Sequence, residues 1–139
     1  MSDASNMLAD RIAVQDVMAR YARHVDEREL DLFRALFDAA VEIDGFGPEP
    51  LVGPDAWLEV VESTLARFGK TQHMLGPVLA EIEGDTARAR TDLQAIHVHL
   101  PPRSGLFTLW GTYHTEMARG DEGWRIVRHR LAVTHVDGG

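Results

Sequence analysis

An aspartate at the edge of an apolar helix face is the first residue of this sequence with an evident chemical use. In YARHVDEREL, residues 21–30, Asp26 stands beside the apolar stripe rather than on the charged side. A carboxylate in this position can hold an imidazole, fix its tautomer and raise its proton affinity. The stripe recurs at intervals of three and four residues, as an amphipathic helix requires, through Val14, Met18, Tyr21, Ala22 and Val25.

Two histidines are placed to share a pocket with that carboxylate. His73 stands in KTQHMLGP, where a helix gives way to the first long strand, and His97 lies on the apolar side of the alternating segment TARARTDLQAIHVHL. In FTLWGTYHTEMAR, Tyr113 shares a side with Leu109 and Met117, so we expect it to line the same pocket. The chain has no cysteine, so histidines and carboxylates must carry any acid-base chemistry.

These residues also have interpretations that involve no acid-base catalysis. The carboxylate can pair with Arg23 or Arg28, and either histidine can be a core residue that donates to a backbone carbonyl. His97 and His99 form a His-x-His pair that, together with His73, offers three nitrogens to a metal. No acidic residue shares their side of the strand nearby, so we expect no metal and no other cofactor.

Three helices are predicted in the first half of the chain. The first carries the apolar stripe and ends near Asp26, and a shorter one spans about residues 30–37. The third spans about residues 54–69, where a Pro-Asp pair suits the helix start. Between the second and third helices, residues 41–43 indicate a short strand, followed by the turn-forming run GFGPEPLVGP.

The second half of the chain is predicted to be extended. Its four segments span about residues 71–83, 86–100, 106–119 and 123–136, and the runs EGD, PPRSG and GDEG separate them as antiparallel hairpins. Helices followed by strands predict one α+β domain over residues 1–139, in which the N-terminal helices pack on one face of a curved sheet. A ligand pocket can form between the two layers.

The composition argues against several classes of partner. The net charge is -8, and the basic residues, all arginine except Lys70, are scattered singly, so no basic stripe follows a nucleic-acid backbone. The N-terminus lacks a signal-like apolar run, and no apolar stretch approaches the roughly 20 residues of a membrane span. We therefore expect a cytoplasmic protein that binds neither nucleic acid nor membrane.

The order of several short motifs resembles the SnoaL-like branch of the nuclear transport factor two superfamily, and within it scytalone dehydratase and its relatives. The motifs are YARHVDERELDLFRALF, TQHMLG, a GD turn before AIHVH, then GTYHTEMAR and GWRIV, and they cover nearly the whole chain. The resemblance implies a cone-shaped nuclear transport factor two-like fold. In that fold, three N-terminal helices pack on a curved, mainly antiparallel sheet that encloses a pocket.

The resemblance also implies a set of catalytic residues. Asp26, His73 in its Thr-Gln-His setting, and His97 match the aspartate and two histidines of scytalone dehydratase. Tyr21 resembles a tyrosine of the related bile-acid dehydratases, and a similar aspartate and histidine pair occurs in hexachlorocyclohexane dehydrochlorinase. The implied mechanism has Asp26 orienting one histidine as the base. The other histidine would protonate the departing hydroxyl, and Tyr21 would stabilise an enolate-like oxygen.

The expected function is a dehydratase-like lyase that needs no cofactor and eliminates water from a small hydroxylated cyclic molecule of polyketide or steroid type. Val25 and Met117 stand where scytalone dehydratase has a tyrosine and an asparagine, so scytalone itself is not the expected substrate. A ketosteroid-isomerase or cyclase reaction, a non-catalytic binder of an apolar molecule, and an interaction subunit remain alternatives on this fold. The residues expected to contact the substrate are Tyr113, Phe46, Trp57, Met74, Leu75 and Met117.

The outer side of the predicted sheet suggests an association between copies of the chain. Ile96, Val98 and Trp110 share that side, and their exposure would leave an apolar patch, so we expect a homodimer through the outer sheet face. The remaining strand histidines have no evident partner, and we expect solvent or interface positions for His114, His129 and His135.

Overall fold

The computed structural model describes residues 3–139. Its helices are α1 (Asp3–Asp26), α2 (Leu30–Arg34) and α3 (Pro54–Leu65). Its strands are β1 (Phe37–Asp44), β2 (Leu51–Val52), β3 (Phe68–Glu83), β4 (Thr86–His99), β5 (Leu106–Gly120) and β6 (Gly123–Asp137). No helix in this range has both the length and the apolar character needed to cross a membrane.

Within the described residues, the six strands form one sheet in the order β2-β1-β6-β5-β4-β3. Neighbouring strands are antiparallel except β1 and β6, which run parallel. Because β6 ends the chain and β1 belongs to its first third, their pairing joins the N-terminal part to the long hairpins. The sheet is therefore mainly antiparallel, as expected.

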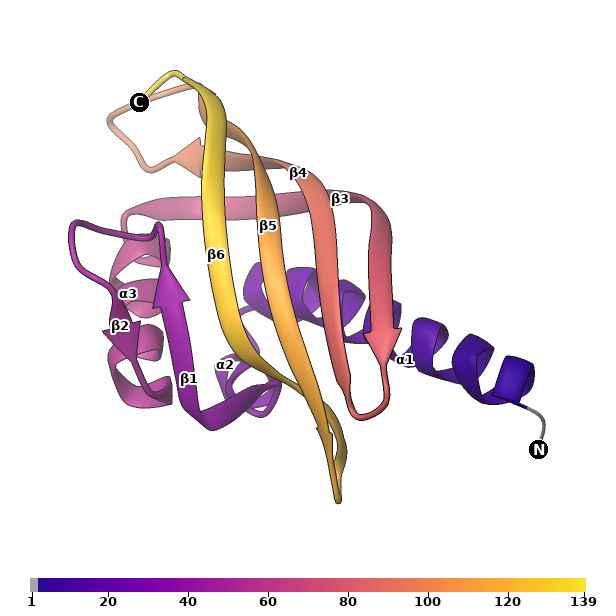
Figure 1. Ribbon diagram of the computed structural model, residues 1–139. Coiled ribbons are helices and arrows are strands. Elements are labelled where there is room, and N and C mark those ends of the chain that lie inside the picture. Colours follow the sequence, from indigo (N-terminus) through magenta and orange to yellow (C-terminus); the bar gives the residue numbers. More distant parts are fainter. Residues whose placement is uncertain (1–2) are drawn as a thin grey trace.

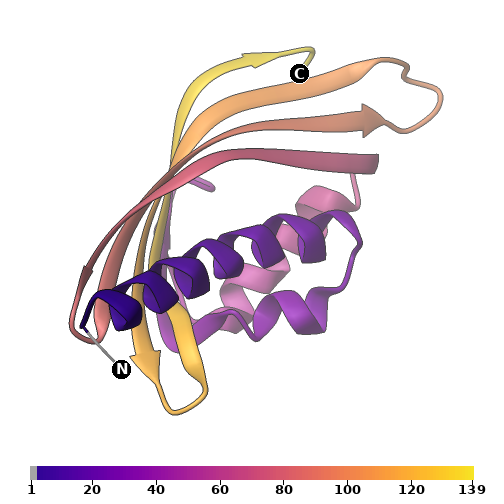
Figure 2. The same ribbon diagram turned by 90° about the vertical axis from the view of Figure 1, so that its right-hand side faces the viewer.

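The sheet curves over the helices, which all lie on its concave side (Figure 1). Figure 2 shows α1 running beneath the arch of the long strands, with α2 and α3 beside it. Helix α1 packs chiefly against β3, whereas α3 packs chiefly against β1 and β2. The layered α+β arrangement places the end of α1 and the start of β3 on the same inner face.

The core fills the space between the helices and the sheet. Helix α1 buries Val14, Met18 and Tyr21 to an exposure of 2% or less, because the three- and four-residue spacing puts them on one face. The ring centroid of Phe33 in α2 lies 4.9 Å from that of Tyr21 and 4.9 Å from that of Phe37 in β1. These edge-to-face contacts connect both N-terminal helices to the first strand.

Helices α2 and α3 are shorter than predicted, because aromatic residues assigned to their ends begin strands instead. Phe37 opens β1 and Phe68 opens β3. A strand that alternates inward and outward can bury an aromatic side chain as well as a helix stripe can, so apolar spacing alone misplaces these boundaries. Helix α3 also follows β1 and β2, so the helices do not all precede the strands.

A bulge in β6 reverses the alternation of its side chains. Consecutive residues of β5 pair with Ile126 and Arg128, so Val127 has no residue opposite it. In a β-bulge, two residues of one strand lie opposite a single residue of the neighbouring strand, and the side chains that follow change sides. Ile126 is buried before the bulge, and His129 is buried after it.

Candidate active site

The carboxylate of Asp26 lies at the C-terminal end of α1, against the start of β3. Its side chain is 18% exposed. Its Oδ1 lies 2.8 Å from ring Nδ1 of His73, and its Oδ2 accepts the backbone N–H of the same residue at 2.7 Å. Thr71 donates its hydroxyl to Oδ1 at 3.0 Å. The helix-edge position thus brings the carboxylate onto the first inward-facing residues of β3.

Arg28 connects the turn after α1 to the start of β3 and forms no ion pair with the Asp26 carboxylate. It has a positive φ of 59°, which is uncommon for a residue other than glycine. Its guanidinium donates to the Gly69 carbonyl at 2.6 Å and to the Thr71 hydroxyl at 2.9 Å. Thr71 therefore accepts from Arg28 and donates to Asp26. Among the residues that the structure describes, the ion-pair partner of Asp26 is His73 and not an arginine.

The ionised carboxylate decides the tautomer of His73. Burial raises the pKa of Asp26, but the hydrogen bonds from His73 and Thr71 together lower it by more, so the net pKa lies below its usual value. An ionised carboxylate can only accept, so Nδ1 of His73 carries a proton. The imidazole side chain is 11% exposed. In the neutral ring, its Nε2 keeps a lone pair that can take a proton from a ligand.

His97 lies on the neighbouring strand β4, with its ring centroid 6.0 Å from that of His73. Its Nδ1 lies 3.1 Å from the carbonyl oxygen of Phe107, which can only accept, so this Nδ1 also carries a proton. Burial lowers the pKa of His97, and that hydrogen bond opposes the shift only in part. The ring is therefore neutral near pH 7, with Nε2 as an acceptor. The acid role expected for a second histidine does not follow from this geometry.

The two imidazoles belong to the wall of a cavity of about 130 Å³ between the helices and the sheet. Most of the wall is apolar and comes from α1, α3 and the inner faces of β4 and β5. Asp26 stands behind His73 and does not belong to the wall. The residues singled out from the sequence that do line the cavity are Tyr21, His73, His97, Tyr113, Phe46 and Trp57.

Three residues expected to contact the substrate lie elsewhere. Met74 is 61% exposed, because alternation along β3 turns it outward while the flanking His73 and Leu75 are partly buried. Leu75 packs against the core but is not part of the cavity wall. Met117 is buried, yet it pairs with Ala87 near the far end of β4, away from the cavity.

His129 is completely buried, so the expectation of a solvent or interface position was wrong for it. Its Nε2 lies 3.0 Å from the Tyr21 hydroxyl, and its Nδ1 lies 2.9 Å from the Thr115 hydroxyl. Burial lowers the pKa of His129 to about 3, so the ring is neutral. In a regular strand, residue 129 would point to the side opposite the buried Ile126. The unpaired Val127 shifts this alternation by one residue, so His129 points inward. No feature of the sequence marks this bulge.

The cavity wall holds three further polar groups. The ring centroids of Tyr21 and Tyr113 lie 5.1 Å apart, and burial raises the pKa of both hydroxyls. The indole N–H of Trp57 is buried and has no acceptor among the described residues. Leaving such a donor unpaired costs about 1–3 kcal/mol.

The His-x-His pair of β4 is engaged by backbone carbonyls. His97 donates to Phe107, and Nε2 of His99 lies 2.8 Å from the carbonyl oxygen of Gly138. A ring nitrogen that donates to a carbonyl has no lone pair for a metal. Over residues 3–139, no three histidine, cysteine, aspartate or glutamate side chains gather so as to hold a metal ion.

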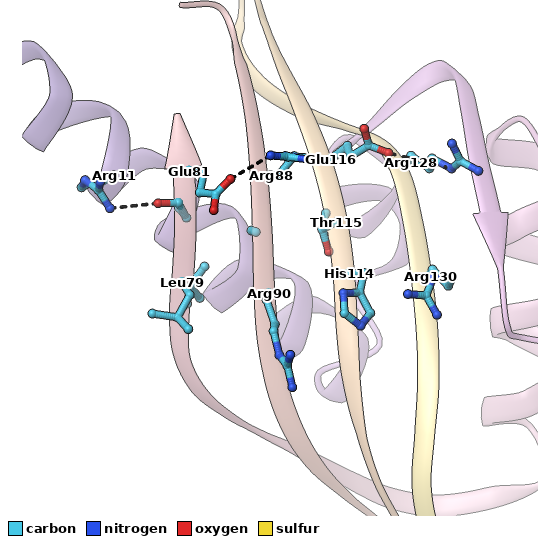
Figure 3. A pocket seen from close by; sticks show the side chains of 13 residues that line it. Arg11, Leu79, Glu81, Arg88, Arg90, His114, Thr115, Glu116, Arg128 and Arg130 are labelled. Carbon is cyan, nitrogen blue, oxygen red and sulfur yellow. Dashed lines mark hydrogen bonds and ion pairs between the residues drawn. The ribbon is translucent and has the colours of Figure 1, made fainter. Parts of the chain in front are cut away.

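A larger hollow of about 800 Å³ lies on the other face of the sheet (Figure 3). Arg90, His114 and Arg130 come side by side there on β4, β5 and β6. The row beside them holds two exposed ion pairs, Arg88 with Glu81 and Arg128 with Glu116. This surface is solvated and carries none of the buried acid-base groups, so the inner cavity is the candidate active site.

Comparison with known proteins identifies similar chains. The family model for the SnoaL-like domain matches residues 6–130. An uncharacterised protein of Mycobacterium tuberculosis is 29% identical over 129 residues, covering 87% of this chain and 83% of that one. A Novosphingobium aromaticivorans protein with the provisional name scytalone dehydratase has a TM-score of 0.89 at 23% identity, covering 96% and 90% of the two chains. A hexachlorocyclohexane dehydrochlorinase from Novosphingobium barchaimii has a TM-score of 0.86 at 18% identity, covering 97% and 93%.

The buried His129 predicts a specific acid sensitivity. Its pKa is about 3 in the folded chain and about 6.5 in an unfolded one, so the unfolded state binds the extra proton between these values. The free energy of unfolding should therefore fall as the pH falls from about 6.5 towards 3. Urea denaturation across this range should give a shallower dependence for His129→Asn. The exposed-site control His135→Asn should keep the wild-type slope, and a wild-type slope in His129→Asn would contradict the assignment.

Proposed function

The chain belongs to the SnoaL-like domain family, and from that premise we propose that it is a cofactor-independent lyase of the dehydratase type. The proposed reaction removes a proton next to the carbonyl of a hydroxylated cyclic molecule and eliminates water. The observation that carries the proposal is the hydrogen bond between Asp26 and His73 at the wall of an apolar cavity. A neutral imidazole backed by a carboxylate is a general base near neutral pH.

His73 is the proposed base. Its Nε2 takes the proton on the carbon next to the carbonyl, and the electrons of that C–H bond form an enolate whose charge rests on the carbonyl oxygen. Asp26, held 2.8 Å from Nδ1, stabilises the imidazolium that results. Three hydrogen bonds fix the carboxylate before the reaction starts, so little reorganisation is needed when charge develops.

The elimination step returns the same proton. The enolate re-forms the carbonyl, its electrons make the carbon-carbon double bond, and the C–O bond of the hydroxyl breaks. His73 gives its proton to the departing oxygen, so water leaves and the ring is again neutral. Neutral His97 accepts a hydrogen bond from the substrate hydroxyl on Nε2 and holds it within reach of His73, whose ring centroid lies 6.0 Å away.

The cavity favours a small ring compound with few polar atoms. Aromatic side chains such as Phe46 and aliphatic ones such as Leu93 form most of its wall. The unpaired N–H of Trp57 suits an oxygen of the substrate. Two structural neighbours bear names that describe eliminations, a dehydratase and a dehydrochlorinase, which supports this class of reaction for the fold they share.

An isomerase is the second candidate, supported by the same base. On a ketone without a suitably placed hydroxyl, His73 can return the proton to a different carbon of the enolate, which moves a double bond without loss of water. Cyclisation in the same cavity would also begin from this enolate. A non-catalytic binder, in contrast, would release its ligand unchanged.

Asp26→Asn should lower the rate of elimination by at least about 10²-fold, because an amide neither favours the required tautomer nor stabilises the imidazolium. Two probes of different size suit the assay, 3-hydroxycyclohexanone and the fused 3-hydroxy-1-tetralone. The enone product of the first is followed by ultraviolet absorbance, and the naphthol formed from the second by fluorescence.

Asp16→Asn is the matched control for this assay. Asp16 lies on the same helix, but its side chain is 55% exposed and pairs with Arg20, so the rate should stay at the wild-type value. Circular dichroism would verify that both variants fold. Wild-type protein that accelerates neither probe, or Asp26→Asn that retains full activity, would contradict the lyase proposal.

We also propose that the outer sheet face pairs two copies of the chain. Val98 is 38% exposed there, and Ile96 and Trp110 on the same side are partly buried. Apolar side chains on a regular sheet can meet their own copies across a twofold axis, which removes them from water.

Sedimentation at micromolar concentration should therefore give the mass of a dimer. Val98→Asp places a charge in the proposed interface and should shift the protein to monomer. Val52→Asp makes the same change at a side chain 68% exposed on β2, outside the proposed interface, and should leave the dimer intact. A monomeric wild-type protein would rule the dimer out.

A further inference from the structure

Three buried polar side chains form one hydrogen-bonded chain beside the cavity, and a fourth lies against its end. Thr115, His129, Tyr21 and Tyr113 are each 2% exposed or less. The Thr115 hydroxyl lies 2.9 Å from Nδ1 of His129, whose Nε2 lies 3.0 Å from the Tyr21 hydroxyl. The ring centroid of Tyr113 lies 5.1 Å from that of Tyr21. Of these four residues, the two tyrosines line the cavity.

Thr115 decides which nitrogen of His129 carries the proton. A neutral imidazole has one donor and one acceptor nitrogen. If Nδ1 were the donor, the Thr115 hydroxyl would accept from it, and the hydroxyl hydrogen would have no acceptor among the described residues. An unpaired donor at so buried a position is costly. If Nε2 is the donor instead, Thr115 donates to Nδ1 and His129 donates to Tyr21, so the hydrogens of Thr115 and His129 are both paired.

This direction decides whether the Tyr21 hydroxyl hydrogen is left for a ligand. If Tyr21 donated to Nε2 of His129, its hydrogen would be used in that bond and could not be donated into the cavity. With Nε2 of His129 as the donor, Tyr21 accepts, and its hydroxyl hydrogen stays free.

We propose that His129 is a positioning residue whose Nε2–H tautomer, held by Thr115, leaves the Tyr21 hydroxyl free to donate to the carbonyl oxygen of the substrate. The inference rests on the proposed function, because that oxygen gains negative charge when His73 removes the neighbouring proton. A donor already in place there stabilises the enolate without reorganisation. The sequence resemblance pointed to Tyr21 for this role, and the structure adds His129 and Thr115 as the residues that direct its hydroxyl.

The pKa shifts of the three rings agree with hydrogen bonds between uncharged groups. Burial lowers the pKa of His129 to about 3 and raises the pKa of both tyrosines, so none of the three rings ionises near neutral pH. No other ionisable group reaches the His129 nitrogens, which contact only the two hydroxyls within the described residues.

Nitrogen NMR of protein labelled with ¹⁵N in its histidine rings tests the tautomer directly. We expect the resonance of His129 to show a protonated Nε2 and an unprotonated Nδ1, and this pattern to be lost in Thr115→Val. Thr112→Val, on the outer side of the same strand, should leave it unchanged. A protonated Nδ1 or an imidazolium at neutral pH in the wild-type protein would overturn the proposal.

Binding of 4-nitrophenol tests the free hydroxyl, since its visible absorbance reports the phenolate, a stand-in for the enolate oxygen. The double variant Tyr21→Phe/Tyr113→Phe should bind the phenolate at least about tenfold more weakly than wild type, as loss of a hydrogen bond to a charged oxygen predicts. Tyr21→Phe alone should lose as much, whereas Tyr113→Phe keeps the proposed donor and should lose less. If the phenolate does not bind detectably to the wild type, or binds equally to the double variant, the proposed hydroxyl donor is ruled out.

Neither experiment depends on turnover. If the elimination assay fails but the tautomer and phenolate binding are as expected, the lyase proposal is rejected and the positioning role of His129 is retained. If the tautomer differs from the expected one but elimination is active, the positioning role of His129 is rejected and the lyase proposal is retained.

Discussion

The contact between Asp26 and the first residues of β3 is the constraint on which the rest of the site depends. A carboxylate at the C-terminal end of a helix opposes the helix dipole, typically by about 0.3–1 kcal/mol. Three hydrogen bonds offset that cost, from the ring and backbone of His73 and from the hydroxyl of Thr71. They also tie α1 to the sheet. The same atoms that join the two layers therefore set the tautomer of His73.

Three histidines on the inner face differ in chemistry because each has a different hydrogen-bond partner. His73 donates to a carboxylate and is the proposed base, whereas His97 donates to a backbone carbonyl and remains a neutral acceptor. His129 lies between two hydroxyls, and its proposed role is to direct a donor towards the cavity. Burial alone would not separate these roles, since all three side chains are largely shielded from water.

Sequence periodicity predicted much of this arrangement, and its limits have identifiable physical causes. The stripe of α1 and the alternation of β4 placed Asp26 and His97 on the inner side, because regular elements keep a constant period. His129 was missed because the bulge at Val127 shifts that period by one, and its cause lies in pairing with β5. Leu75 packs against the core and Met117 is buried on the side that its strand pattern predicts, but a pattern cannot tell the core from the cavity wall. The tautomers depend on contacts distant in sequence, such as that between residues 26 and 73.

The central claim is that His73 removes the proton and His97 only holds the leaving hydroxyl. Proton exchange of cyclohexanone in D₂O needs the first step alone, whereas elimination from 3-hydroxycyclohexanone needs both, so the two rates separate the roles. We predict that His73→Gln loses both activities by at least about 10²-fold, and that His97→Gln keeps exchange but loses elimination. Exchange that survives in His73→Gln, or that fails equally in His97→Gln, would contradict this account.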